Sequence, residues 1–116
     1  NKQDASESVF LTKAIELVEK NLHVPGYSVE QLSRDLCMER TGLYRKLVAM
    51  LDQSPSLFIR NIRLQRAAQL ILEGSLSITE IAERTGFSSS SYLSKCFQEM
   101  YGCRPSEYAE KMQKST

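Results

Sequence analysis

The sequence predicts an all-α protein of seven helices, in which two similar helical units are joined by one long central linker helix. Three observations lead to this prediction. Helix start and stop signals divide the chain at short intervals, no stretch alternates apolar and polar residues as a strand does, and one pattern of residues occurs twice. The 116 residues are 41% hydrophobic and 25% charged, which is an ordinary globular composition and enough chain to bury an apolar core.

The first four elements follow from local signals. A first helix is expected from residues 4–7 to a break at 24–26, and a capping box at 28–31 then opens a short second helix. A third, amphipathic stretch runs from Arg40 to about Leu51. An N-cap followed by proline, at 54–55, opens the long helix, which has no breaker until Gly74.

The remaining elements repeat this order. A second capping box at 77–80 opens a short helix that ends at Gly86, and a longer helix runs from about Ser89 to Tyr101. Arg104 and Pro105 open the last helix.

The two halves are copies of one unit. Equivalent residues are 49 positions apart before the internal turn and 50 positions apart after it, as in Val29/Ile78, Leu32/Ile81, Cys37/Gly86, Leu43/Leu93, Leu47/Phe97, Asp52/Gly102, Pro55/Pro105 and Phe58/Tyr108. Each copy is a short helix, a tight turn and a longer helix, which is the helix-turn-helix pattern. We therefore expect a first helix-turn-helix subdomain at 1–53, a linker helix at 54–73 and a second helix-turn-helix subdomain at 74–116.

Duplication with a long helix between the copies fits a double reader of DNA. Recognition helices that enter successive major grooves lie about 34 Å apart, and a linker helix of roughly 30 Å is a suitable spacer.

The residues of the repeat resemble the C-terminal DNA-binding domain of AraC/XylS-type transcription activators. The resemblance covers about residues 8–110, and its motifs are Leu43–Leu47, Ile59–Leu64, Ile78–Ala82, Gly86-Phe87, Tyr92–Phe97, Tyr101-Gly102 and Pro105–Tyr108. It implies a regulator that binds double-stranded promoter DNA and acts on RNA polymerase. It also implies sensor, receiver or dimerisation domains outside this chain, and a homodimer formed through the parent protein.

The segment Leu43–Leu47 is also similar to the output domain of hybrid two-component regulators of gut Bacteroidetes, in which one long membrane protein carries sensor, kinase, receiver and DNA-binding module. That similarity implies a place at the cytoplasmic end of an inner-membrane protein. The chain does not begin with Met, so we expect a fragment of a longer protein, with processing of the N-terminus as the alternative.

Four positions depart from the family pattern. Glu39 stands where a serine N-cap is usual, and Asp52 where glycine is usual. Leu93 and Lys95 replace the commoner phenylalanine and arginine.

Helical periodicity separates a core face from an exposed face on each recognition helix. The expected core residues are Leu43, Leu47, Met50 and Leu51 in the first helix, and Leu93, Cys96, Phe97 and Met100 in the second. The opposite faces, where the family contacts bases, carry Thr41, Tyr44, Arg45 and Val48, and Ser91, Ser94, Lys95 and Gln98. The alternative is that these faces are only solvated polar surfaces.

Side-chain chemistry assigns roles on these faces. Arg45 suits a bidentate contact to guanine, Tyr44 a sugar, a thymine methyl or a phosphate, and Thr41 and Val48 a methyl group. For the second helix we expect either base contacts in the second groove or contacts to the DNA backbone alone, from Lys95, Ser91, Ser94 and Gln98. The expected phosphate contacts are Arg40, Lys46, Ser28, Ser77 and Ser90.

The net charge of +1 hides an uneven distribution. Residues 1–39 carry 4 basic and 7 acidic side chains, residues 40–66 carry 6 and 1, and residues 67–116 carry 5 and 6. A basic band therefore covers the first recognition helix and the linker helix, and it predicts that the first unit anchors DNA. Within this band, Arg60, Arg63 and Arg66 are expected to form ion pairs and pack their stems, with contact to the DNA backbone as the alternative.

Other function classes have less support. The near-neutral charge and the serine-rich second recognition helix leave open a helical protein-interaction module without DNA binding. With one histidine, no glycine-rich phosphate loop and no metal-ligand cluster, we expect no catalysis, no metal and no cofactor. Three cysteines without a C-x-x-C spacing indicate a reduced, cytoplasmic setting, and no apolar run approaches the roughly 20 residues that span a membrane.

Overall fold

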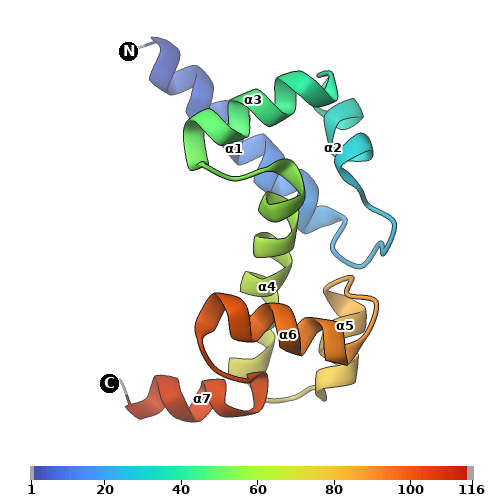
Figure 1. Cartoon of the computed structure of the whole chain (residues 1–116), viewed down its shortest axis with the longest axis vertical. Coiled ribbons are helices and arrows are strands. Elements are labelled where there is room, and N and C mark those ends of the chain that lie inside the picture. The colour runs from blue at the N-terminus through green and yellow to red at the C-terminus, as the bar shows by residue number, and fades with distance from the viewer. Residues whose placement is uncertain (1, 115–116) are drawn as a thin grey trace. The chain divides into compact units, whose positions relative to one another are not determined.

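A computed structural model describes residues 2–114, and within that range it contains seven helices and no strand (Figure 1). The helices are α1 (Lys2–Lys20), α2 (Val29–Asp35), α3 (Arg40–Leu51), α4 (Pro55–Glu73), α5 (Ile78–Arg84), α6 (Ser90–Tyr101) and α7 (Pro105–Lys114). The predicted all-α class and order of elements are confirmed. α1 ends before the predicted break at 24–26, because the side chain of Asn21 donates a hydrogen bond to the Leu17 carbonyl at 2.8 Å and caps the last turn.

The chain forms two compact units. The first comprises residues 1–21 and 26–62, and the second residues 22–25 and 63–116, of which residues 1 and 115–116 lie outside the described range. The boundary falls inside α4, because this helix buries Phe58 in the first unit and Leu64 in the second. The division into a first helix-turn-helix subdomain at 1–53, a linker helix at 54–73 and a second subdomain at 74–116 stays a prediction.

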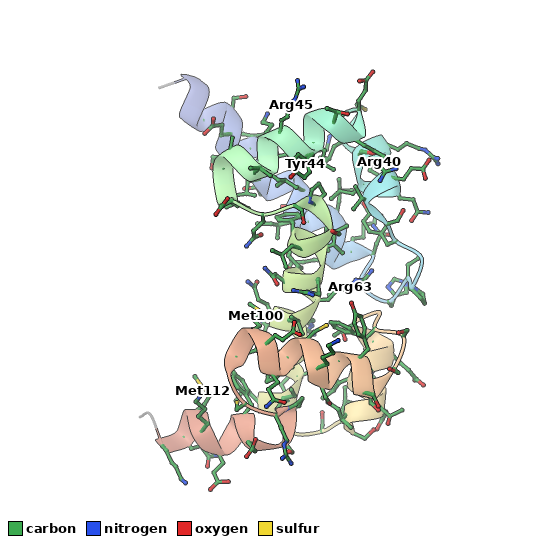
Figure 2. All side chains as sticks on the ribbon, viewed as in Figure 1. Arg40, Tyr44, Arg45, Arg63, Met100 and Met112 are labelled. Carbon is green, nitrogen blue, oxygen red and sulfur yellow. The ribbon has the colours of Figure 1, made fainter. Side chains whose placement is uncertain are left out.

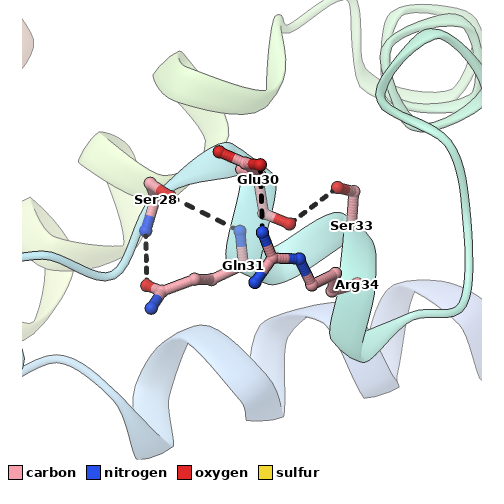
Figure 3. Close-up of polar contacts among 5 residues, drawn as sticks. All are labelled: Ser28, Glu30, Gln31, Ser33 and Arg34. Carbon is pink, nitrogen blue, oxygen red and sulfur yellow. Dashed lines mark hydrogen bonds and ion pairs between the residues drawn. The ribbon is translucent and has the colours of Figure 1, made fainter.

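Capping boxes begin both short helices, as the sequence predicts, and Figure 3 shows the one at the start of α2. The Ser28 hydroxyl accepts a hydrogen bond from the Gln31 amide at 3.4 Å, and the Gln31 side chain accepts one from the Ser28 amide at 3.2 Å. Ser77 and Glu80 repeat the arrangement at 3.2 and 3.1 Å, and the hydrogen bonds from Ser77 lower the pKa of Glu80. Each box satisfies two amides that a helix start leaves without a partner, which stabilises helices as short as α2 and α5.

The turns of the two units differ in backbone strain. Gly86 and Gly102 adopt left-handed conformations, with φ of 80° and 74°. At the equivalent positions of the first unit, Cys37 and Asp52 both have φ of 56°. An L-residue in this region costs roughly 1–2 kcal/mol, with aspartate among the better tolerated. The first unit therefore keeps strain at two positions where the second has glycine.

The core faces of the recognition helices agree only in part with their prediction. Leu43 and Leu47 of α3 are buried, as are Leu93, Cys96 and Phe97 of α6, where the Phe97 ring meets Tyr108 edge-to-face at 5.2 Å. Leu51 and Met100, however, are 37% and 39% exposed, so their prediction as core residues is wrong. Both lie in the last turn of their helix, where the chain leaves through a left-handed cap and helical periodicity no longer decides what covers a side chain.

A buried tyrosine ties the loop after α1 to α2 and gives a prediction on pH. The Tyr27 hydroxyl donates to Asp35 at 3.0 Å, and burial, with this hydrogen bond and the Asp35 charge, raises the pKa of Tyr27 from 10.0 to about 12. The unfolded chain ionises at the lower pKa, so stability present below pH 10 is lost as the pH rises to about 12, by on the order of 1–3 kcal/mol. Urea denaturation across this range should show the loss. In Tyr27→Phe this component should be absent, and equal slopes for the two proteins would refute the assignment.

Candidate nucleic-acid interface

The exposed face of α3 carries three of the four residues predicted to contact bases. Thr41, Tyr44 and Arg45 are exposed, Tyr44 by 53%, and Val48 is half-buried. Arg40, Tyr44 and Arg45 project from this helix in Figure 2. None of these three side chains has a hydrogen bond or ion pair with another described residue. The buried leucines on the opposite side of α3 thus fix the helix, and the polar groups of its exposed face are available to a ligand.

The corresponding face of α6 is less charged. Ser91, Lys95 and Gln98 are exposed and Ser94 is half-buried. Lys95 is the only cation of this helix and has no ion pair with a described residue. α6 begins with a true N-cap, since the Ser89 hydroxyl accepts a hydrogen bond from the Tyr92 amide at 3.0 Å. The N-cap of α3, Glu39, makes no such bond, as its departure from the family pattern suggests.

A groove lies beside each recognition helix, and the two grooves are related by the internal repeat. Each is bordered by the start of the preceding short helix, one side of the recognition helix and the start of the helix that follows. The first is lined by Val29, Arg40, Thr41, Tyr44, Ser54, Pro55 and Ser56, and the second by Ile71, Leu76, Ile78, Ile81, Ser94, Lys95, Gln98, Arg104, Pro105, Ser106 and Ala109. The structure thus brings predicted base-contact and phosphate-contact residues together at the first groove. At the second, three predicted base-contact residues border an apolar floor.

The remaining predicted phosphate contacts already have intramolecular roles or are partly covered. The Lys46 ammonium lies 4.3 Å from the centre of the Phe10 ring, a cation–π contact that holds its stem against α1. Ser28 and Ser77 are N-caps, and Ser90 is half-buried at the start of α6.

Arg63 has a role that the sequence analysis missed. Only 6% exposed, it donates hydrogen bonds to the backbone carbonyls of Leu22 at 2.5 Å, Thr85 at 2.8 Å and Val24 at 3.3 Å. Burial lowers the pKa of its guanidinium. One signal could have shown this, because Arg63 lies at helical spacing from Ile59, Ala67 and Leu70, which are all buried.

The two neighbouring arginines of the predicted ion-pair set behave differently. Arg66 donates to Gln69 at 2.9 Å on the surface, and the Nε of Arg60 is buried without a hydrogen-bond partner among the described residues. The basic band at residues 40–66 therefore includes one charge that is sequestered in the interior, at Arg63.

None of the described helices is both long and apolar enough to cross a membrane. In the same part of the chain, no three histidine, cysteine or acidic side chains lie together as a metal site would need.

Residues 32–111 match the family described as a helix-turn-helix domain. The structure resembles that of a transcriptional regulator with an AraC-type DNA-binding domain from Chromobacterium violaceum, with a TM-score of 0.83, 29% identity and coverage of 92% of this chain and 95% of the other. The chain belongs to the AraC-type helix-turn-helix family. It is a DNA-binding domain, as the sequence predicts.

Curated relatives of this AraC-type domain are much longer proteins. It is 40% identical over 98 residues to histidine kinase P4 of Formosa agariphila, a match that covers 84% of this chain and 7% of the kinase. It is 32% identical over 97 residues to the HTH-type transcriptional regulator ArgR of Pseudomonas aeruginosa, covering 84% of this chain and 29% of the regulator. The chain thus spans less than a third of either relative.

Proposed function

We propose that this AraC-type domain binds double-stranded promoter DNA sequence-specifically, with α3 and α6 entering successive major grooves, as the output domain of a transcription regulator. The exposed face of α3 is the observation that carries the proposal. Tyr44 and Arg45 stand on it without partners among the described residues, while Leu43 and Leu47 fix the helix from behind. A rigid helix that presents an unpaired guanidinium suits the reading of base edges in a major groove.

We assign a role to each side chain that is predicted to contact DNA. Arg45 would bind guanine O6 and N7 in bidentate fashion, Tyr44 a sugar, thymine methyl or phosphate, and Thr41 and Val48 methyl groups. On α6, Ser91, Ser94, Lys95 and Gln98 would read the second groove. Arg40, Lys46, Ser28, Ser77 and Ser90 would contact phosphates, and so fix the register of the domain on the duplex.

The two units are proposed to contribute unequally. α3 carries three basic side chains, Arg40, Arg45 and Lys46, whereas α6 carries only Lys95. Since phosphate contacts supply much of the affinity for DNA, the first unit would anchor the domain and the second would add discrimination. A domain with so few free cations is helped by a tether or a partner that raises its effective concentration.

The parent protein is proposed to be a two-component regulator. The match to 7% of a histidine kinase supports a long sensor protein that carries this module at its cytoplasmic end, anchored in the inner membrane. Homodimerisation through that parent and contact with RNA polymerase complete the proposal. The chain itself is assigned no catalytic role.

The test is a binding titration against ionic strength. Duplexes selected from random DNA are titrated by fluorescence anisotropy, and log K should fall linearly with log salt by about 0.9 for each phosphate neutralised. Arg40→Ala should weaken selected and random duplexes alike and reduce the slope by about 1. Arg34→Ala is the matched control, because Arg34 is also exposed but pairs with Glu30 on α2 at 3.0 Å, and it should change little. No salt-sensitive binding at low ionic strength would instead favour a protein-interaction module.

A further inference from the structure

We propose that Arg63 positions the second recognition helix by fixing the turn through which the chain passes from α5 into α6. The inference rests on the proposed function of α6 in reading DNA. Arg63 itself touches no DNA in this proposal. It acts through the backbone of the turn. Its side chain, labelled in Figure 2, extends from α4 and is almost completely buried.

The first contact is with the end of α5. Thr85 is the C-cap of that helix and is fully buried, and its carbonyl accepts a hydrogen bond from Arg63 at 2.8 Å. The Thr85 hydroxyl donates back to the Ile81 carbonyl at 2.7 Å. Thr85 is therefore bound to its own helix through its hydroxyl and to a charged donor through its carbonyl. A hydrogen bond to a charged group is stronger than one between neutral groups.

The second contact is with Gly86, the next residue. Its φ is 80°, and a Cβ built there would collide with Arg63 Nη1 and with the Leu22 carbonyl oxygen. The bare Cα therefore lies directly against the guanidinium. Phe87, which follows, is buried in the core of the second unit, and its amide donates to the Ala82 carbonyl at 2.9 Å. Only Ser88 and the N-cap Ser89 separate this fixed segment from the first residue of α6.

The third contact is with the segment that follows α1. The carbonyls of Leu22 and Val24, in the segment that follows α1, accept hydrogen bonds from the same side chain. The planar fork of an arginine can donate in several directions at once, whereas a lysine ammonium is a single point and methionine donates nothing. A change at position 63 would thus release the turn and the segment 22–25 together.

The first unit has no counterpart of this device. The positions 49 and 50 residues before Arg63 are Ala14 and Lys13, and Cys37, which has a Cβ, stands at the place of Gly86. Removal of Arg63 should therefore disturb only the second helix-turn-helix. We call the parts of the DNA site read by α3 and by α6 the first and the second half-site. A general loss of stability would weaken binding to both half-sites, whereas loss of a positioning role would affect only the second.

The experiment compares Arg63→Met and Arg63→Lys with Arg66→Met, an exposed arginine less than one turn away on the same helix. Amide hydrogen exchange of residues 85–91 and anisotropy on a selected duplex with either half-site scrambled are measured, after circular dichroism has shown that each variant is folded. Arg63→Met should speed exchange in the turn and reduce discrimination at the second half-site by about fivefold or more, while discrimination at the first half-site stays as in the wild type. Arg63→Lys should fall between, and Arg66→Met should match the wild type.

Unchanged exchange in the turn, or equal losses at both half-sites, would overturn the inference. Should Arg63→Met fail to fold, Arg63→Lys carries the same two readouts. Should the wild-type chain bind no duplex, the proposed function fails, and the exchange rates of residues 85–91 alone then decide the role of Arg63.

Discussion

Replacement of Gly86 with alanine is expected to destabilise the second unit by about 3 kcal/mol or more. A Cβ at a φ of 80° is itself unfavourable by roughly 1–2 kcal/mol. The added methyl would also displace the guanidinium of Arg63, and each buried polar group left without a partner costs about 1–3 kcal/mol more. Urea denaturation followed by circular dichroism measures the change in the free energy of unfolding.

The matched control is the equivalent position of the first unit, where Cys37→Gly should act in the opposite direction. Cys37 has a φ of 56°, which glycine adopts without strain, so we expect a gain of up to about 1 kcal/mol. If Gly86→Ala altered the free energy of unfolding by less than about 1 kcal/mol, the close approach of Arg63 to this turn would be wrong.

Loss of the Arg45 side chain is expected to weaken binding to the selected site by about 5- to 150-fold, with little effect on random duplex. A bidentate contact to guanine discriminates by roughly 1–3 kcal/mol, and the exposed, unpaired guanidinium of Arg45 is free to make one. Anisotropy titrations of Arg45→Ala measure the loss. A duplex with 7-deazaguanine in place of the contacted guanine lacks N7, so it should weaken the wild type but not Arg45→Ala.

Arg45→Lys provides the control for charge alone. It keeps the cation but not the planar fork, so binding to random duplex should be retained while discrimination falls. Equal losses on selected and random DNA would show that Arg45 contacts phosphates and reads no base.

The fold was predictable because its signals are local. Ser28 with Gln31 and Ser77 with Glu80 form their capping boxes within a single helical turn, and Ser54 caps the Leu57 amide at 3.3 Å next to the proline that begins α4. The exposed face of α3 followed equally from residue spacing, since burial of Leu43 and Leu47 leaves Tyr44 and Arg45 on the other side.

What the sequence did not predict depends on residues far apart in the chain. Arg63 contacts carbonyls 41 and 22 positions away, and no local pattern states which backbone will meet a charged side chain. Leu51 and Met100 failed for a related reason. A periodic pattern places them on the core face, but whether anything covers the last turn of a helix is decided by the path of the chain beyond it.

The division of α4 between the two units limits how the protein can be taken apart. A fragment that stopped at Gln53 would leave out Phe58, Ile59 and Ile62, which complete the first core, and one that began at Gly74 would lack Leu64, Ala67 and Leu70 of the second. Although the sequence is a duplication, each copy uses part of α4 to complete its core. A single-unit DNA-binding protein made from this chain should therefore retain the whole of α4. The apolar α4 side chains that the missing unit would bury should be replaced by polar ones.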